Sequence, residues 1–227
     1  MTRFIIISVI SVIIYGCECV PGIDAPKVIS PENSTNCLFI NAIEDNNDIS
    51  FLTDEIQIVG KVNYLVTNNE FKKVKIGNSY IKIIANDGIS SIYNSPVEFL
   101  KDKNYILGAA GKGFDIHTLV APDYINSLDN EDYVKIINLA GNKNPLSVSM
   151  VFSSDTLVYQ LNPISATEYI KIPENKTKMI FVTNQVGELE ATIRDYQFEK
   201  NRNLLILKGN NFSSTKTLFI DVIGLEK

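Results

Sequence analysis

The tripeptide Ile40-Asn41-Ala42 in the first half of the chain has a counterpart, Ile137-Asn138-Leu139, 97 residues later. Further matches follow in the same order, at offsets between 96 and 99: 74–76 with 170–172, 99–105 with 198–204, and 118–120 with 217–219. Two copies of one fold produce this pattern, because loops of different length shift the offset without changing the order. The sequence therefore predicts two consecutive modules.

The repeat also sets the expected domain boundaries. We expect the first module at residues 37–121 and the second at 133–227, joined by a linker at 122–132. The linker combines proline, asparagine and serine with four acidic residues, a composition typical of connecting segments. These acidic residues are Asp123, Asp129, Glu131 and Asp132.

Within each module the local signals are those of β-strands. Short runs rich in Ile, Val, Tyr and Phe alternate with Asn, Asp, Gly and Ser, which favour turns. In the first module these runs are 38–43, 56–65, 80–85, 105–109 and 116–120. Two further segments, 71–76 in the first module and 169–172 in the second, nearly alternate apolar and polar residues. Asn86-Asp87-Gly88 suits a hairpin turn. The sequence thus predicts an all-β protein with two tandem antiparallel β-sandwich, immunoglobulin-like domains, each closing its own core.

The amino terminus has the composition of an export signal. Arg3 precedes a run of twelve residues, 4–15, in which only two serines are not hydrophobic. Such a run is too short to span a bilayer, which needs roughly 20 helical residues, but it suits a secretory signal peptide. We expect residues 1–16 to be this signal, and the alternative is a retained membrane helix.

Ile14-Tyr15-Gly16-Cys17 ends that run and resembles the lipobox of bacterial lipoproteins. The resemblance implies that Cys17 is the lipid attachment site and the first residue of the mature chain. Residues 17–36 contain Pro21, Pro26 and Pro31 among polar residues and are expected to form a tether. In an ordinary secreted protein the cysteines would have another use, such as a disulfide between Cys19 and Cys37.

Within the predicted modules, 38–45 and 133–139 open the two copies, and Lys101-Asp102-Lys103-Asn104-Tyr105 precedes a closing strand. This arrangement resembles the family known as domain of unknown function 4397, which is often found in tandem in bacterial lipoproteins. The resemblance covers nearly all of residues 37–224. It implies a β-sandwich with an exported, surface-associated role, and it implies no reaction.

The composition excludes several functional classes. The chain of 227 residues has 21 basic and 26 acidic residues, a net charge of −5, and no dense cluster of lysine or arginine. Binding to a phosphate backbone requires such a cluster, so we do not expect nucleic acid as a partner. One histidine, three cysteines and no tryptophan leave few side chains for metal centres or nucleophilic relays. We expect no metal, no cofactor and no enzymatic activity.

Three features of the sequence have the composition of chemical sites. His117 is the only imidazole that could serve a Ser-His-acid relay, and we interpret it as a surface histidine. The glycine-rich segment 108–113 suggests a phosphate cradle, but its lysine precedes glycine rather than serine or threonine, so we expect a turn. Residues 44–48 offer several oxygen ligands for Ca²⁺, yet their spacing favours an acidic turn.

The predicted function is therefore an exported, lipid-anchored, non-enzymatic protein of the cell envelope, at the outer membrane or the cell surface, or else secreted. Its expected partners are the membrane, through the amino-terminal lipid, and an envelope polysaccharide or protein. Two alternatives stay open. One is an accessory chain of a carbohydrate-active or peptide-acting hydrolase that uses carboxylates, and the other is a purely architectural spacer.

Overall fold

The computed structural model describes residues 29–44, 48–67, 70–85, 91–113, 115–125, 131–141, 144–199, 201–210 and 217–225. This part of the chain consists of strands, turns and one short 3-10 helix, η1 (Pro31–Asn33). No helix among these residues has the length and apolar character needed to cross a bilayer. The predicted signal peptide, Cys17 and the turn at 86–88 lie outside the described residues.

The first module is a sandwich of two four-stranded sheets. Outer sheet 1 has the order β3-β2-β5-β6 and inner sheet 1 the order β4-β1-β7-β8. The strands are β1 (Ser34–Ile43), β2 (Asp48–Thr53), β3 (Ile56–Asn63), β4 (Lys72–Lys75), β5 (Gly77–Ile84), β6 (Ser91–Phe99), β7 (Asn104–Lys112) and β8 (Asp115–Pro122). Because β1 begins at Ser34, the strand includes the last three residues of the predicted tether.

The second module repeats this topology. Inner sheet 2 has the order β12-β9-β16-β17, with β13 also paired to β9, and outer sheet 2 has the order β11-β10-β14-β15. The strands are β9 (Tyr133–Ala140), β10 (Leu146–Val151), β11 (Thr156–Leu161), β12 (Ser165–Ala166), β13 (Ile170–Lys171), β14 (Met179–Thr183), β15 (Leu189–Arg194), β16 (Arg202–Asn210) and β17 (Thr217–Leu225). The predicted all-β, two-sandwich fold is confirmed.

Each inner sheet contains one parallel pair that the sequence analysis did not predict. β1 runs parallel to β7, and β9 runs parallel to β16, whereas the other paired strands of the described chain are antiparallel. Parallel neighbours need a long crossover connection. Here the outer sheet provides it, because the chain passes through β2, β3, β5 and β6 between β1 and β7.

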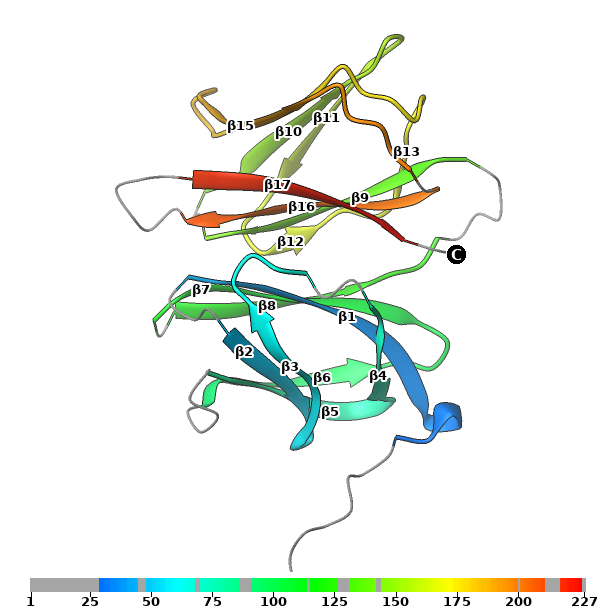
Figure 1. Cartoon of the computed structure of the whole chain (residues 1–227), viewed down its shortest axis with the longest axis vertical. Coiled ribbons are helices and arrows are strands. Elements are labelled where there is room, and N and C mark those ends of the chain that lie inside the picture. The colour runs from blue at the N-terminus through cyan, green and yellow to red at the C-terminus, as the bar shows by residue number, and fades with distance from the viewer. Residues whose placement is uncertain are drawn as a thin grey trace, which may run out of the picture.

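The four sheets are stacked in four layers, with the two inner sheets in the middle (Figure 1). Each module has its own core, centred on residues such as Phe51 and Ile83 in the first and Met150 and Val182 in the second. A third core lies between the inner sheets and includes Leu38, Ile40 and Ala42 of β1, Ile106 and Ala110 of β7, Ile137 and Leu139 of β9, and Leu204 and Ile206 of β16.

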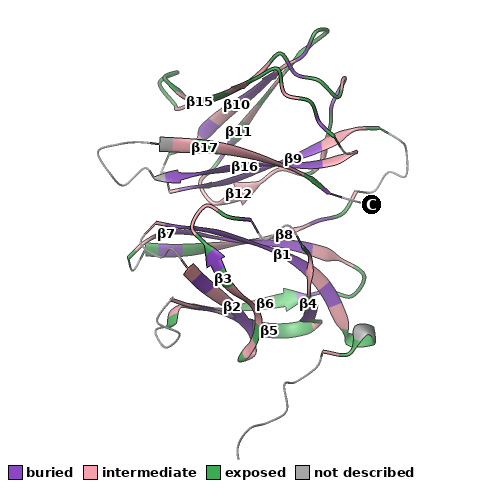
Figure 2. Cartoon of the chain, viewed as in Figure 1, coloured by how far each residue is buried: buried purple, intermediate pink, exposed green. Residues whose placement is uncertain are grey.

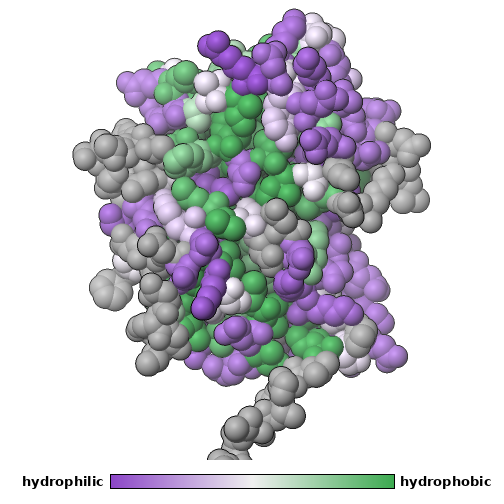
Figure 3. Space-filling model, in the orientation of Figure 1, coloured by the Kyte–Doolittle hydropathy of each residue, from purple (hydrophilic) through white to green (hydrophobic). Residues whose placement is uncertain are grey.

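The third core explains why the central inner strands β1, β7 and β9 are buried along most of their length (Figure 2). Successive side chains of one strand point to opposite faces, so the inner strands fill a module core on one face and the third core on the other. On the face of the molecule shown in Figure 3, hydrophobic residues gather along the middle and hydrophilic residues cover the flanks. Only the two module cores were expected from the sequence.

The internal repeat is visible in two equivalent asparagines. The Asn41 side chain accepts a hydrogen bond from the Ile43 amide at 2.9 Å and donates one to the Val62 carbonyl at 2.8 Å. Asn138 does the same with the Ala140 amide at 3.1 Å and the Asn162 carbonyl at 3.0 Å. Each buried amide thus ties the first strand of its module to a neighbouring segment of chain.

A buried lysine joins the two modules. Lys208 of β16 has a side chain that is 3% exposed, and its ammonium donates hydrogen bonds to the Leu65 carbonyl, to Thr67 Oγ1 at 3.4 Å and to Asp221 Oδ2 at 2.7 Å. Leu65 and Thr67 belong to the first module, whereas Asp221 lies on β17 of the second. The lysine therefore joins a loop of the first module to inner sheet 2 of the second module through hydrogen bonds.

A second polar cluster forms where the chain enters the second module. Asp123, an acidic residue of the predicted linker, has a fully buried carboxylate that accepts hydrogen bonds from the Tyr169 hydroxyl and from Arg202, both at 2.5 Å. Burial and the negative charge of Asp123 raise the pKa of Tyr169. Asp123 thus lies in the connection between β8 and β9, and its carboxylate is bonded to side chains of the second module.

Candidate functional site

The outer face of outer sheet 2 is the best candidate for a binding surface. Val148, Met150 and Val182 point into the module core, so the side chains between them in β10 and β14 point outward. The strand register arranges the outward residues in three rows. The rows are Gln160, Ser147, Thr183 and Leu189; Val158, Ser149, Phe181 and Thr192; and Thr156, Val151, Met179 and Arg194.

This face is almost uncharged. Of the twelve residues in the three rows, Arg194 alone carries a charge, and hydroxyl groups and apolar side chains make up most of the rest. Outer sheet 1 differs, because Lys82 of β5 forms an ion pair with Glu55 at 3.0 Å. The face of outer sheet 2 can therefore make hydrogen bonds and apolar contacts without desolvating many charges.

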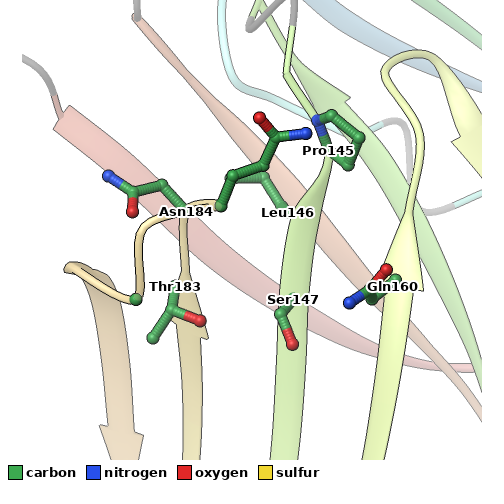
Figure 4. Close-up of a pocket in the computed structure, with 8 residues that line it drawn as sticks. Pro145, Leu146, Ser147, Gln160, Thr183 and Asn184 are labelled. Carbon is green, nitrogen blue, oxygen red and sulfur yellow. The ribbon is translucent and has the colours of Figure 1, made fainter.

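A hollow of about 490 Å³ lies at one end of this face. Ser147, Thr183 and Gln160 line it from three neighbouring strands, and their side chains lie side by side in Figure 4. The remaining lining residues are Pro145, Leu146, Asn184, Gln185 and Gly187. The volume lies within the range of small-ligand pockets. Since none of the lining residues has an ionisable side chain, the hollow offers hydrogen bonds but no acid or base.

Four of the lining side chains are free to bind a ligand. Ser147, Gln160, Thr183 and Gln185 form no side-chain hydrogen bond among the residues that the structure describes. Together they supply two hydroxyls and two carboxamides, each of which both donates and accepts. A ligand rich in hydroxyl groups matches this set.

Asn184, in the loop between β14 and β15, lines the hollow and forms hydrogen bonds within that loop. Its side-chain oxygen accepts hydrogen bonds from the amides of Val186 at 3.1 Å and Glu188 at 3.0 Å. Its side-chain nitrogen donates to Glu188 Oε2 and to Glu190 Oε1, both at 2.9 Å. The Asn184 side chain points away from the other labelled residues in Figure 4. The loop therefore holds its shape through its own contacts.

This hollow was not predicted from the sequence. The available signal was the alternation of residues 146–151, Leu-Ser-Val-Ser-Met-Val, which places serines on the face opposite the core. That alternation shows one strand face, but the neighbours of Ser147 across the sheet come from strands whose register the sequence does not reveal.

His117 lies on the surface, as the sequence analysis expected. It is exposed in β8, and Nε2 lies 2.8 Å from Asp115 Oδ1. Asp115 and His117 both sit on the edge strand of inner sheet 1, and the hollow lies in outer sheet 2. The imidazole is therefore not part of the candidate site.

The glycine-rich segment 108–113 is mostly strand. Gly108 to Lys112 belong to β7, with Gly113 in the connection to β8, so only the end of the segment forms the expected turn. A Cβ atom on Gly108 would lie 2.5 Å from Leu139 in the third core. On Gly111, which has a φ of +129°, it would lie 2.0 Å from the Asp115 carbonyl oxygen. Packing and backbone geometry explain both glycines.

Residues 45–47 of the acidic segment 44–48 lie outside the described residues. The Glu44 side chain is 3% exposed, and its carboxylate lies 3.5 Å from the Lys112 ammonium. In the described part of the chain, no group of three or more His, Cys, Asp or Glu residues could hold a metal ion.

Cys37 is a free thiol buried in the first module core. Burial raises its pKa, so the thiol stays protonated. Its suggested partner, Cys19, lies outside the described residues, as does Cys17.

Two further hollows flank the exposed Val66. One, of about 490 Å³, includes Asp221, which is paired with Lys208, and the other, of about 390 Å³, includes Glu70, which lies 2.5 Å from Lys72. Each has a single carboxylate in its lining, and a cation neutralises it. The arrangement of two facing carboxylates that glycoside hydrolysis needs is absent from both.

No family model and no curated protein matches this chain. One similar solved structure is CBMbc, a family CBM26 domain of Eubacterium rectale Amy13K, in complex with maltoheptaose. It is 8% identical, with a TM-score of 0.24, and the match covers 86% of this chain and 98% of that domain. The fold described above rests on the strand pairing of this chain itself.

Proposed function

We propose that this protein is an exported, lipid-anchored, non-enzymatic binding protein of the cell envelope that contacts a polysaccharide through outer sheet 2. The observation that carries the proposal is the hollow, in which Ser147, Gln160, Thr183 and Gln185 present free hydroxyls and carboxamides. Sugars offer hydroxyl groups that pair with such side chains, and the apolar residues beside the hollow suit the C–H faces of a sugar ring.

The lining favours binding over hydrolysis. A two-carboxylate mechanism needs an acid and a base or nucleophile on opposite sides of the bound sugar. The residues around the hollow supply neither, so a bound sugar would be held without reaction. A hydrolase accessory chain that uses carboxylates has no corresponding support at this site.

Export and anchoring are supported by the sequence alone. The apolar run at 4–15, the lipobox-like residues ending in Cys17 and the resemblance to the domain of unknown function 4397 family favour a surface-associated lipoprotein. Mass spectrometry of the mature amino terminus tests this part of the proposal. An acylated Cys17 is the expected result, and an unmodified terminus beyond Cys17 would remove the anchor.

Binding is tested with a glycan array probed with the full chain in detergent. We expect retention on uncharged polysaccharides. The double variant Ser147→Ala/Gln160→Ala should bind about 5- to 150-fold more weakly, because each lost hydrogen bond contributes about 0.5–1.5 kcal/mol. Asn94→Ala on exposed β6 of outer sheet 1 is the control, and its binding should equal that of the unaltered chain.

Two results contradict the proposal. Absence of binding to every glycan would favour a spacer or a protein partner. Equal loss in the control variant would place the binding surface elsewhere.

A further inference from the structure

The outward face of outer sheet 2 continues beyond the hollow along the strands. The row at the hollow includes Ser147 of β10 and Thr183 of β14. Two residues away along the same strands, Ser149 and Phe181 belong to the next row. Because a strand rises about 3.4 Å per residue, neighbouring rows lie roughly 7 Å apart. A ligand that is seated in the hollow and extends along the strands therefore reaches the second row.

The second row offers apolar surface rather than hydrogen bonds. Phe181 is half-buried, and its two neighbours in β14 point into the module core, so its ring lies on the outward face. Val158 of β11 is 58% exposed, whereas Ser149, between the two in the row, is 6% exposed. Thr192, at the end of the row, donates its hydroxyl to the Ile180 carbonyl at 3.2 Å. The ring and the valine are therefore the main contacts that this row presents.

A chain of linked sugars matches this change from polar to apolar surface. Each sugar ring has hydroxyl groups around its edge and C–H groups on its faces. An aromatic ring offers a large apolar area, and the negative charge of its face attracts positively polarised C–H groups. The hydroxyls of one unit can thus pair with the side chains of the hollow while a face of the next unit lies on Phe181.

We propose that outer sheet 2 binds an extended glycan, with one sugar unit in the hollow and the next stacked on Phe181. This inference rests on the proposed function and specifies its ligand as a chain of linked units rather than a single sugar. The three rows cover about 14 Å, which is longer than one sugar ring. None of the residues in the first two rows carries a charge, and Arg194 lies in the third.

The experiment uses a series of chain lengths. The probes are oligosaccharides of one to six units, prepared from the polysaccharide that binds best on the array. Affinities are measured by NMR titration of the full chain in detergent, which covers weak binding. Phe181→Ala removes the ring, and Val158→Asn removes apolar surface at a position too exposed to affect folding. Tyr80→Ala is the matched control, because Tyr80 is an aromatic residue of β5, 59% exposed, in outer sheet 1.

The affinity of the unaltered chain should rise with chain length and then level off once the face is covered. Phe181→Ala should bind the longer chains about 3- to 10-fold more weakly and the single sugar with unchanged affinity. Val158→Asn should weaken the binding of the longer chains in the same way. Tyr80→Ala should change no value at any length.

An affinity that does not depend on chain length would overturn the inference and leave the proposed function intact. An equal loss at every length in Phe181→Ala would also overturn it, since the ring would then only support the hollow. Failure to bind any glycan would overturn the proposed function itself.

A second copy of the chain is the other occupant that an apolar row suits. Analytical ultracentrifugation without glycan separates this case. The unaltered chain and Phe181→Ala should sediment alike, and a dimer that Phe181→Ala dissociates would assign the row to self-association and overturn the inference.

Discussion

At the scale of single residues, polar groups hold the two modules together at buried positions. Asp123 has a fully buried carboxylate, and Tyr169 and Arg202 of the second module donate hydrogen bonds to it. A buried acceptor that loses one of its donors is costly, because no water replaces the lost bond. Tyr169 is thus the residue at which the junction can be tested with the smallest change.

Tyr169→Phe should lower the free energy of unfolding at pH 7 by about 1–3 kcal/mol, since Asp123 loses one donor. The variant should also change how the free energy of unfolding depends on pH above pH 10. The folded state keeps the phenolic proton above pH 10, because the pKa of Tyr169 is raised, whereas the unfolded state loses it. Stability from this group is therefore present below pH 10 and falls as the pH rises further.

Urea unfolding between pH 7 and pH 11 measures both effects. The unaltered chain should lose stability more steeply above pH 10 than Tyr169→Phe, by at most about 1.4 kcal/mol per pH unit. Parallel slopes for the two proteins would show that Tyr169 is not the titrating group.

The two glycines at the end of β7 provide a second test at this scale. Gly111→Ala should destabilise the protein by about 2 kcal/mol or more, because its Cβ would lie 2.0 Å from a backbone oxygen at a φ of +129°. Gly113→Ala is the matched control, since it also has a positive φ but open space around its Cβ, and it should cost about 1 kcal/mol. Thermal unfolding followed by circular dichroism compares them, and equal losses would contradict the assigned contact.

At the scale of strands, the inner elements were easier to predict than the outer ones. The predicted runs at 38–43 and 105–109 became parts of β1 and β7, because strands packed on both faces carry dense apolar residues. The run at 116–120 became part of β8, a half-buried edge strand of the same sheet. β6 was missed, since Asn94, Pro96 and Glu98 alternate along an edge strand that tolerates proline. Hydrophobic runs reveal burial, but they do not reveal which sheet a strand will join.

The candidate site could not be predicted from the sequence, for a related reason. Ser147, Gln160 and Thr183 are ordinary surface residues in the sequence, and they become neighbours only through the pairing of three strands. The same holds for Lys208, whose partners Leu65 and Thr67 are more than 140 residues away along the chain.

The contact between β16 and the first module can be tested at Lys208. Lys208→Met keeps the apolar stem but leaves the Leu65 carbonyl without its donor, so the free energy of unfolding should fall by about 1–3 kcal/mol. Lys82→Met is the control, because Lys82 pairs with Glu55, which is largely exposed, and such pairs contribute at most about 1 kcal/mol. Chemical denaturation measures both, and an equal loss in the two variants would deny Lys208 a special role at the junction.

At the scale of the whole molecule, the third core joins the two sandwiches, and we expect them to unfold as one unit. Leu139, Ile106 and their neighbours lose contact with the facing sheet when either module unfolds. Apolar surface exposed in this way contributes roughly 25 cal/mol per Å² to the free energy of separation. The repeat in the sequence indicates two modules, but it gives no sign of this coupling.

Differential scanning calorimetry should therefore show one transition, with a calorimetric enthalpy equal to the van't Hoff enthalpy. Leu139→Asp places a charge in the third core, and it should lower the midpoint and separate the transition into two. Two transitions in the unaltered protein would mean that the modules fold independently.

The four-layer stack also determines how far outer sheet 2 lies from the first strand of the chain. Sheets packed face to face lie about 10 Å apart, so outer sheet 2 stands roughly 20 Å above inner sheet 1, in which β1 is the first strand of the chain. A protein tied to a lipid surface by its amino terminus would carry the outer face of outer sheet 2 on the far side of that column. The hollow beside Ser147 would then stand away from the lipid headgroups.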